Sequence, residues 1–248
     1  MVSIDPHSPV PVLMAGVRDE FLERPWFPPG RHWPGQPQLV GGQDLQARGT
    51  WLAVNPGVPR VACVLNAHGE PAEDARRLSR GELPLRLAAA GEPGDLDPTR
   101  YDPFHLVCST PGSTRLWSWD GRKLVERALD AGLHIIANSG LEGADDNGGP
   151  GAEQIRARID HFRPLFEKAA RPEPGEEDAE HAWGEWLPLV SGAGLDPAEP
   201  HALVLRRIID DQRWGTSSLS LVALTRNGAR YDFCANPADL HPAWSRVL

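Results

Sequence analysis

The chain has 248 residues, of which 40% are apolar and 24% are charged, with a formal net charge of −9 at pH 7. This composition is typical of a folded globular protein, and the negative charge argues against nucleic acid or an anionic membrane as the main partner. The cysteines Cys63, Cys108 and Cys234 have no CxxC spacing, so we expect neither a disulfide framework nor a metal site. No apolar run is long enough to span a membrane, and no signal-peptide pattern opens the chain. We therefore expect a cytoplasmic protein with no membrane span, folded as one domain over residues 1–248.

Short apolar runs bounded by Gly, Pro and Asn predict strands through much of the chain. Asp120-Gly121 and Asn227-Gly228 each separate two such runs, which is the sequence signal of a tight β-hairpin. A proline-rich loop at residues 56–59 joins a third pair. The predicted strands are residues 10–15, 50–55, 60–65, 106–109, 115–119, 123–127, 133–137, 219–225 and 229–233.

Helices are predicted mainly between the first and the last strands. Ile155, Ile159, Phe162 and Phe166 recur at helical spacing, and Pro164 inside this pattern is expected to kink or end the helix. Residues 82–90, 179–190 and 200–210 are further predicted helices, the last with proline in its first turn. Antiparallel strands with helices inserted between them predict an α+β fold.

Residues 16–20, Gly-Val-Arg-Asp-Glu, put three ionisable side chains directly after a predicted strand. Charge alone favours a solvated turn here. However, the following residues, 21–29, are rich in aromatic side chains and proline, and they would surround the charges with apolar surface. Partly buried charges stabilise one another, and such clusters are common at reactive sites. Both interpretations, a solvated turn and a buried reactive cluster, remain open at this point.

The same segment resembles the start of the NRDE family, also called the transport and Golgi organisation protein 2 family. The similarity begins at residues 12–21, Val-Leu-Met-Ala-Gly-Val-Arg-Asp-Glu-Phe, and later short blocks follow in the family's order along nearly the whole chain. The family signature reads Asn-Arg-Asp-Glu, and this chain has Val17 in place of the asparagine. The later blocks are Arg24-Pro25, Trp33, Gly41-Gly42-Gln43-Asp44, residues 49–54, Leu65-Asn66, residues 79–83, residues 136–139 and residues 214–218.

The resemblance implies an N-terminal-nucleophile (Ntn) hydrolase-like αββα sandwich, in which two mainly antiparallel sheets lie between helices. In enzymes of that fold, the N-terminal cysteine thiol attacks an amide and its own α-amino group acts as the base. By resemblance, Arg18 and Asp19 would position the nucleophile, and Asn66 and Asn138 would stabilise the oxyanion. The substrate-binding candidates are Glu20, Trp51 and Arg213. No metal or cofactor is implied.

The main departure from the family lies at residue 2, where members usually carry cysteine and this chain has Val2. Cys63 lies in a predicted strand and is interpreted as a core thiol. The first apolar run, Val2-Ser3-Ile4, is shorter than the usual five or six residues of a strand. Only Lys123 and Lys168 among the 25 basic residues are lysine, a bias typical of GC-rich genomes, in which GTG start codons are common. We therefore expect the true start roughly four residues upstream, with Met-Cys and a full first strand; the alternative is true loss of the nucleophile.

Three functions remain open on this basis. The first is a cysteine-type Ntn amidohydrolase that cleaves a linear amide of a small molecule. The second is a non-catalytic carrier of haem or another hydrophobic cargo, because eukaryotic relatives have been tied to haem handling and secretion; haem would then be cargo and not a cofactor. The third is a degenerate Ntn fold without activity. A fold does not fix a function, so the site must decide between them.

Overall fold

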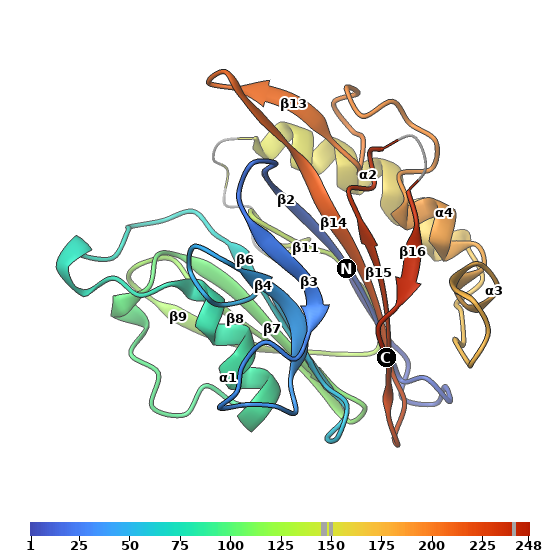
Figure 1. Ribbon diagram of the computed structural model, residues 1–248, viewed down its shortest axis with the longest axis horizontal. Helices are drawn as coiled ribbons and strands as arrows, with labels where there is room; N and C mark the ends of the chain where they lie inside the picture. The colour runs from blue at the N-terminus through green and yellow to red at the C-terminus, as the bar shows by residue number, and fades with distance from the viewer. Residues whose placement is uncertain (145–147, 149–150, 240–241) are drawn as a thin grey trace.

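The computed structural model of the chain describes residues 1–144, 148, 151–239 and 242–248. Two antiparallel sheets lie face to face, and helices cover their outer sides (Figure 1). Sheet 1 has the order β10-β1-β2-β14-β15-β16, and β13 pairs with β14 beside this path. Its strands are β1 (Val2–Ile4), β2 (Val12–Phe21), β10 (Gly132–His134), β13 (Arg206–Ile209), β14 (Gln212–Leu224), β15 (Ala229–Ala235) and β16 (Trp244–Arg246).

Sheet 2 is a meander in chain order, β3 to β9. Its strands are β3 (Trp26–Gly30), β4 (Val40–Asp44), β5 (Leu52–Asn55), β6 (Arg60–Asn66), β7 (Phe104–Thr110), β8 (Ser113–Trp119) and β9 (Leu124–Leu129). A small hairpin of β11 (Ile136–Ala137) and β12 (Gly140–Leu141) follows β10. The helices are α1 (Leu83–Ala90), α2 (Ala152–Lys168), α3 (Ala179–Trp183) and α4 (Trp186–Val190), with short 3₁₀ turns at Asp74–Arg76, Arg80–Glu82 and Pro98–Arg100.

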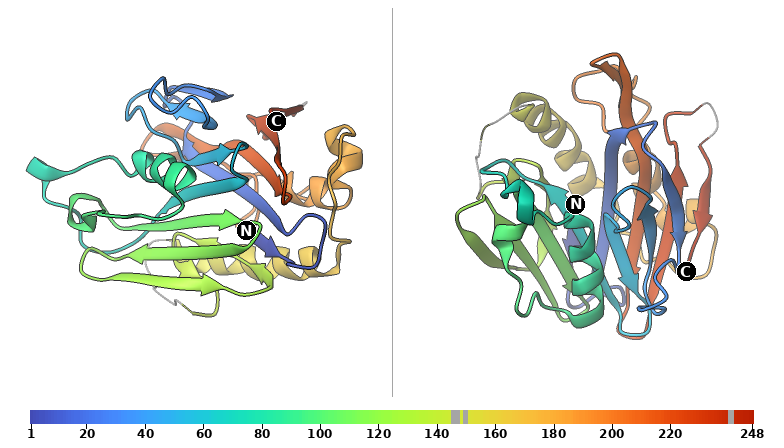
Figure 2. Two further views of the ribbon diagram at one scale, coloured as in Figure 1. Left: turned by 90° about the horizontal axis from the view of Figure 1, so that it is seen from below. Right: turned by 60° about the vertical axis from the view of Figure 1, so that its left-hand side comes forward.

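Strand alternation divides the apolar side chains into three layers. Along β2, Val12 and Met14 pack into the between-sheet cluster, whereas Leu13 and Ala15 pack against α2, α3 and α4. Sheet 2 divides in the same way, with one face in the between-sheet cluster and the other covered by α1. Figure 2 shows these layers from two further sides. The fold is thus the α+β sandwich of two antiparallel sheets between helices that the sequence predicts.

The three predicted hairpins are confirmed. Asp120-Gly121 joins β8 to β9, Asn227-Gly228 joins β14 to β15, and the proline-rich loop joins β5 to β6. Gly121 has a φ of 93°, which an L side chain rarely adopts, so glycine is required at this turn.

Three helix predictions are wrong in part or in whole. Helix α2 continues through Pro164 to Lys168. The buried Phe162 and Phe166 hold it there, since each contributes about 1.5–3 kcal/mol and together they offset the roughly 3 kcal/mol cost of an interior proline. Residues 200–210 form no helix but lead into β13, because Ile208 and Ile209 are β-branched and pair with β14 across a tight turn.

The predicted helix at residues 179–190 is divided into α3 and α4 at Gly184, whose φ of 46° and ψ of −125° are outside the helical region. Of the two interpretations of residues 16–20, the solvated turn is not formed, because β2 runs on to Phe21. Within the described residues, no helix combines the length and apolar character needed to cross a membrane.

Candidate functional site

The extended course of β2 separates the two charged residues that the sequence assigns to one role. Residue 18 follows Met14 by two alternations, so Arg18 faces the space between the sheets, near Trp51 of sheet 2. Asp19 faces the opposite side, where it contacts Arg158 of α2. The structure therefore brings Arg18 and Glu20 together and does not bring Asp19 to them.

Arg18 lies at the centre of a charged group that we call the Arg18 cluster: Arg18, Glu20, Arg24 and Asp44. Its guanidinium lies 3.5 Å from the Glu20 carboxylate and 3.7 Å from that of Asp44, and it donates a hydrogen bond of 2.7 Å to Ser217 Oγ. Arg18 is only 9% exposed, and burial lowers the pKa of its guanidinium against the opposing effect of both carboxylates. Arg18 is nevertheless charged at neutral pH, because an arginine pKa starts above 12.

Asp44 anchors this cluster at the end of β4. Its Oδ1 accepts hydrogen bonds from the backbone N–H groups of Gln46 (2.9 Å) and Ala47 (2.8 Å), and its Oδ2 accepts one of 2.5 Å from Arg24 Nε. Burial alone would raise the pKa of Asp44, but these hydrogen bonds outweigh it and hold the pKa below its ordinary value. Asp44 is therefore a fixed anion to which Arg18 and Arg24 are oriented.

Trp51 provides the apolar wall of the cluster. The Arg18 guanidinium carbon lies 4.5 Å from the centroid of the Trp51 ring, a cation–π contact, and Trp26 meets the same ring edge to face at 5.8 Å. A Cβ atom at Gly42 would overlap the Trp51 ring, so glycine at this position of β4 lets the indole lie against the sheet. The predicted site residue Trp51 thus contacts the predicted site residue Arg18.

Asp19 belongs to a separate group on the outer side of sheet 1. Thr216 Oγ1 donates a hydrogen bond of 2.7 Å to Asp19, and Arg158 of α2 lies 3.5 Å from the same carboxylate. Burial raises the pKa of Asp19, and Arg158 and Thr216 oppose this shift without cancelling it. These contacts join β2 to β14 and α2. They hold the strand that carries Arg18 in place from the side of sheet 1 that faces away from Arg18.

Three predicted site residues, Asn66, Asn138 and Arg213, do not contact the Arg18 cluster. Asn66 ends β6 and is exposed; its neighbour Leu65 packs between the sheets, so alternation turns Asn66 to the other side. Asn138 is exposed in the turn between β11 and β12. Arg213 is exposed on β14 and forms an ion pair of 2.7 Å with Glu23.

Met1 continues the pairing of β1 with β2 in sheet 1. The Met1 ammonium donates a hydrogen bond of 2.9 Å to the Ala15 carbonyl, and burial lowers the pKa of this amino group. Cys63 of β6 faces the same region, and burial raises the pKa of its thiol to about 11. The Cys63 thiol therefore stays protonated at neutral pH, which agrees with the core position that the sequence indicates.

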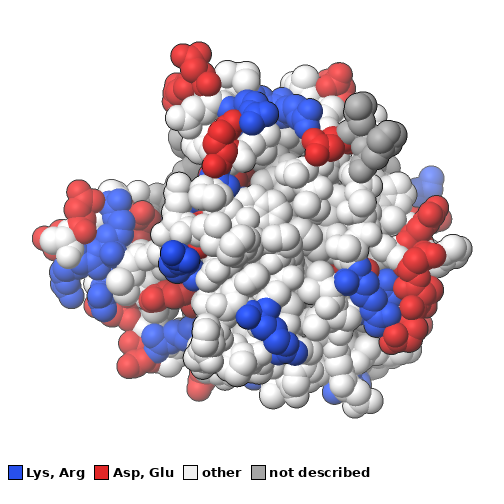
Figure 3. All heavy atoms as spheres, viewed as in Figure 1, with Lys and Arg blue, Asp and Glu red and all other residues white. Residues whose placement is uncertain are grey.

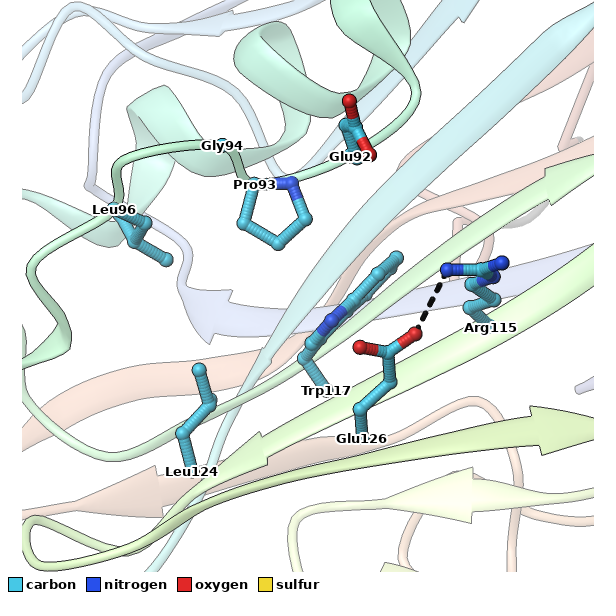
Figure 4. A pocket seen from close by; sticks show the side chains of 8 residues that line it. All are labelled: Glu92, Pro93, Gly94, Leu96, Arg115, Trp117, Leu124 and Glu126. Atoms are coloured by element: carbon cyan, nitrogen blue, oxygen red, sulfur yellow. Dashed lines mark hydrogen bonds and ion pairs between the residues drawn. The ribbon is translucent and has the colours of Figure 1, made fainter.

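Two open cavities lie away from the Arg18 cluster. One, of about 420 Å³, lies under the loop after α1, with Trp117, Leu124 and the ion pair of Arg115 and Glu126 along one side (Figure 4). The other, of about 400 Å³, is lined in part by Arg213 and Thr216. Among the described residues, no group of three or more His, Cys, Asp or Glu side chains is arranged to hold a metal ion.

Sequence reasoning missed four residues that hold this region together. Arg24 and Asp44 complete the Arg18 cluster, Ser217 binds the Arg18 side chain, and Arg158 pairs with Asp19. Arg24, Asp44 and Ser217 lie in segments that carry the family resemblance, so the resemblance could have indicated them as site residues. Arg158 lies on the polar face of the predicted helix, where an arginine is expected to be exposed. Its pairing with Asp19 depends on how α2 packs on sheet 1, which the sequence does not show.

Two antiparallel sheets that lie between helices form an α+β sandwich of the Ntn-hydrolase-like kind. The structure of penicillin V acylase from Agrobacterium tumefaciens is similar, with a TM-score of 0.51 over 99% of this chain and 85% of that chain. At 15% sequence identity, the similarity concerns the fold alone.

The sequence resemblance is confirmed at the level of the family. The chain belongs to the Transport and Golgi organisation 2 family, whose sequence profile matches residues 1–233. A comparison with curated proteins gives no match.

Proposed function

We propose that this protein is an Ntn amidohydrolase in a form of the chain whose first strand continues upstream of Met1 and begins with cysteine. The observation that carries the proposal is the position of Arg18. It is a buried cation on an inner strand, and β1 pairs with β2 only as far as Met14, whereas β14 pairs with β2 as far as Phe21. An upstream continuation of β1 would run along the remaining edge of β2 toward Arg18.

The strand register supports the length that we propose for this continuation. Val2 is opposite Met14, and each step back along β1 is one step forward along β2. Met1 is thus opposite Ala15, and the third residue before Met1 would be opposite Arg18. This is the position at which a start four residues upstream, with the initiator Met removed, would put the N-terminal cysteine.

The alternation of the strand gives the direction of the thiol. The third residue before Met1 lies four positions from Val2, whose side chain is in the between-sheet cluster, so its side chain would face the same space. Arg18 faces that space from the neighbouring strand. On the other side of β1, Val2 is opposite His134, the last residue of β10, and the chain then enters the small hairpin β11–β12 whose turn contains Asn138. An N-terminal cysteine would therefore lie beside Arg18, on the side of the molecule where the Asn138 hairpin follows β10.

These neighbours suit the chemistry of an N-terminal thiol. The free α-amino group, with an ordinary pKa near 8, would take the thiol proton, and the Arg18 guanidinium would lower the pKa of both groups. The thiolate would attack an amide carbonyl, the amino group would return the proton to the leaving amine, and water would hydrolyse the resulting thioester. Asn138 is the oxyanion donor that we favour, because Asn66 lies on the far side of sheet 2.

The remaining candidates take supporting roles in this proposal. Glu20 and Asp44 hold the Arg18 side chain, and Trp51 gives the site an apolar wall for the acyl part of a substrate. Asp19 would act as a positioning residue. It binds Thr216 and Arg158 on the opposite side of β2 and so holds the strand that carries Arg18. Arg213, paired with Glu23 in an exposed hairpin, would contact only a substrate that extends out of the site.

The test is acylation of the longer chain. It is produced from its native upstream start, treated with p-nitrophenyl acetate, and analysed by intact mass before and after hydroxylamine, which cleaves thioesters. We expect one hydroxylamine-sensitive acetyl group on the N-terminal residue. Arg18→Met should abolish this acetylation. Arg115→Met, which changes an exposed arginine, should leave the acetylation unchanged.

The three cysteines of the described chain are internal controls for this test. Burial raises the pKa of Cys63 and Cys234 to about 11 and that of Cys108 to about 12, so all three should remain unlabelled at neutral pH. Labelling at any of these three at the rate of the N-terminal residue, or an upstream sequence without cysteine, would contradict the proposal.

Transport of haem or another hydrophobic cargo is a second candidate, and one surface feature favours it. Phe27 is 49% exposed and stacks on His32, which in turn meets Trp33 edge to face. In the view of Figure 3, the middle of the molecular face is largely free of charged side chains. A saturable shift of the haem absorbance band that is lost in His32→Ala would support this candidate, and no shift at micromolar protein would exclude it.

A further inference from the structure

The outer strand of the hairpin β13–β14 carries an unusual exposed surface. Ile208 is 68% exposed and Ile209 is 39% exposed, the former being the most exposed large apolar side chain among the described residues. The hairpin projects beyond the body of the molecule (Figure 1), and β13 pairs only with β14. Its other edge is open.

The register of the hairpin shows which backbone groups lie at this open edge. Ile209 is opposite Gln212 across the two-residue turn, and Thr216 N–H donates to the Leu205 carbonyl, so the odd-numbered residues of β13 bond to β14. The N–H and C=O groups of Ile208 therefore point outward. The outward N–H of Arg206 is already bonded to the Pro197 carbonyl at 3.2 Å. Ile208 is thus the centre of the free edge.

We propose that β13 is a self-association edge, at which the partner is a second copy of this chain paired antiparallel about a two-fold axis. In such a pair the residue at the axis must face itself, and the outward backbone groups make Ile208 that residue. Its N–H and C=O would exchange two hydrogen bonds with those of Ile208 in the second copy. The two exposed isoleucine side chains would cover each other on one face of the joined sheet.

The charges around Ile208 complement each other in this register. With Ile208 opposite itself, the exposed Asp210 in the turn of the second copy comes next to Arg206, and this contact occurs twice. Arg206 now forms an ion pair of 2.9 Å with Asp239, but both side chains are more than half exposed. Exchange of one exposed ion pair for another therefore costs little. Because a short strand pair buries less area than a standard interface, we expect a weak dimer that depends on concentration.

Sedimentation velocity across the micromolar-to-millimolar range tests this directly. The weight-average mass of the wild type should rise toward that of a dimer, and Ile208→Asp should remain monomeric. Val58→Asp is the matched control, since Val58 is 53% exposed in a turn away from β13, and it should associate as the wild type does. A wild type that stays monomeric throughout, or equal behaviour of the two Asp variants, would overturn the proposal.

A mixing experiment tests the register itself. Arg206→Glu would face Asp210 with like charge, and Asp210→Arg would face Arg206 with like charge, so each variant alone should be monomeric. A mixture of the two gives a heterodimer in which both facing pairs have opposite charge, and association should return. Circular dichroism confirms that both variants are folded. Association of either variant alone, or none in the mixture, would contradict the pairing of residues 206 and 210.

Discussion

Two buried groups of arginine and aspartate in this protein differ in how completely their charges are paired. In the first, Arg230 and Asp232 of β15 are 5% and 0% exposed, and Asp232 accepts hydrogen bonds of 2.6 and 3.1 Å from Arg230 and 2.7 Å from Trp183 Nε1. In the second, the Arg18 guanidinium stays 3.5 and 3.7 Å from its carboxylates.

The difference separates a structural pair from a site candidate. Asp232 accepts short hydrogen bonds from Arg230 and Trp183, and it thereby joins α3 to β15. Its charge is neutralised by Arg230, so it is not available to another group. The charge of Arg18 is held in place by Ser217 and Trp51 and is shared loosely between two anions, one of which already binds Arg24. Such a cation can act on a group brought next to it, which in the longer chain that we propose is an N-terminal thiol.

Removal of Asp232 should have the largest effect on stability. Asp232→Ala leaves Arg230 and Trp183 Nε1 buried without their acceptor, and loss of one member of a buried pair costs about 3–5 kcal/mol. Urea unfolding followed by circular dichroism measures this loss. Glu176→Gln, which breaks the exposed ion pair with Arg246, is the control and should cost at most about 1 kcal/mol. Equal losses in both variants would contradict a structural role for Asp232.

Removal of Arg18 should destabilise the fold less than removal of Asp232, but it should abolish the proposed acylation. Asp44 keeps Arg24 and two backbone N–H groups in Arg18→Met, so no buried charge loses all its partners. We expect a loss of about 1–2 kcal/mol from the hydrogen bond to Ser217, measured by the same unfolding titration. A loss as large as that of Asp232→Ala would show that the two groups are both structural.

The two aspartates of this region should respond to pH with opposite signs. The pKa of Asp44 is lowered in the folded state, so its stabilisation is present above the ordinary Asp pKa, about 3.9, and is lost as pH falls below it. The pKa of Asp19 is raised mainly by burial, so the folded state binds its proton more tightly and stability falls as pH rises through that higher pKa.

A pH series of unfolding free energies for the wild type, Asp44→Asn and Asp19→Asn measures these effects. Relative to its Asn variant, the wild type should gain stability through Asp44 and lose it through Asp19 as pH rises from the acid range to neutrality. Slopes of the same sign for both variants would contradict the separate environments of the two carboxylates.

Local signals in the sequence predicted the hairpins and the sandwich well. Asp120-Gly121 and Asn227-Gly228 favour turns whatever surrounds them, and the family resemblance supplied the layer order. The failures have tertiary causes. Pro164 stays within α2 because Phe162 and Phe166 are buried on both sides of it, and Ile208 and Ile209 form a strand because β14 is available to pair with them.

The roles assigned to the candidate site residues stay predictions, but their positions can be compared with the structure. Arg18, Glu20 and Trp51 lie together, whereas Asp19 does not join them. Had residues 16–20 been read as a continuation of the strand, alternation alone would have put Arg18 and Asp19 on opposite faces. The contact of Asp19 with Arg158 could not be predicted, because it depends on where α2 packs.

N-terminal sequencing combined with the intact mass of the protein from its native source tests the central claim most directly. We predict a mature chain that is three residues longer than the sequence from Met1 and begins with cysteine, opposite Arg18 in the register of β1 and β2. A mature chain that begins at Met1 or Val2 would contradict the catalytic proposal and leave binding as the function to test.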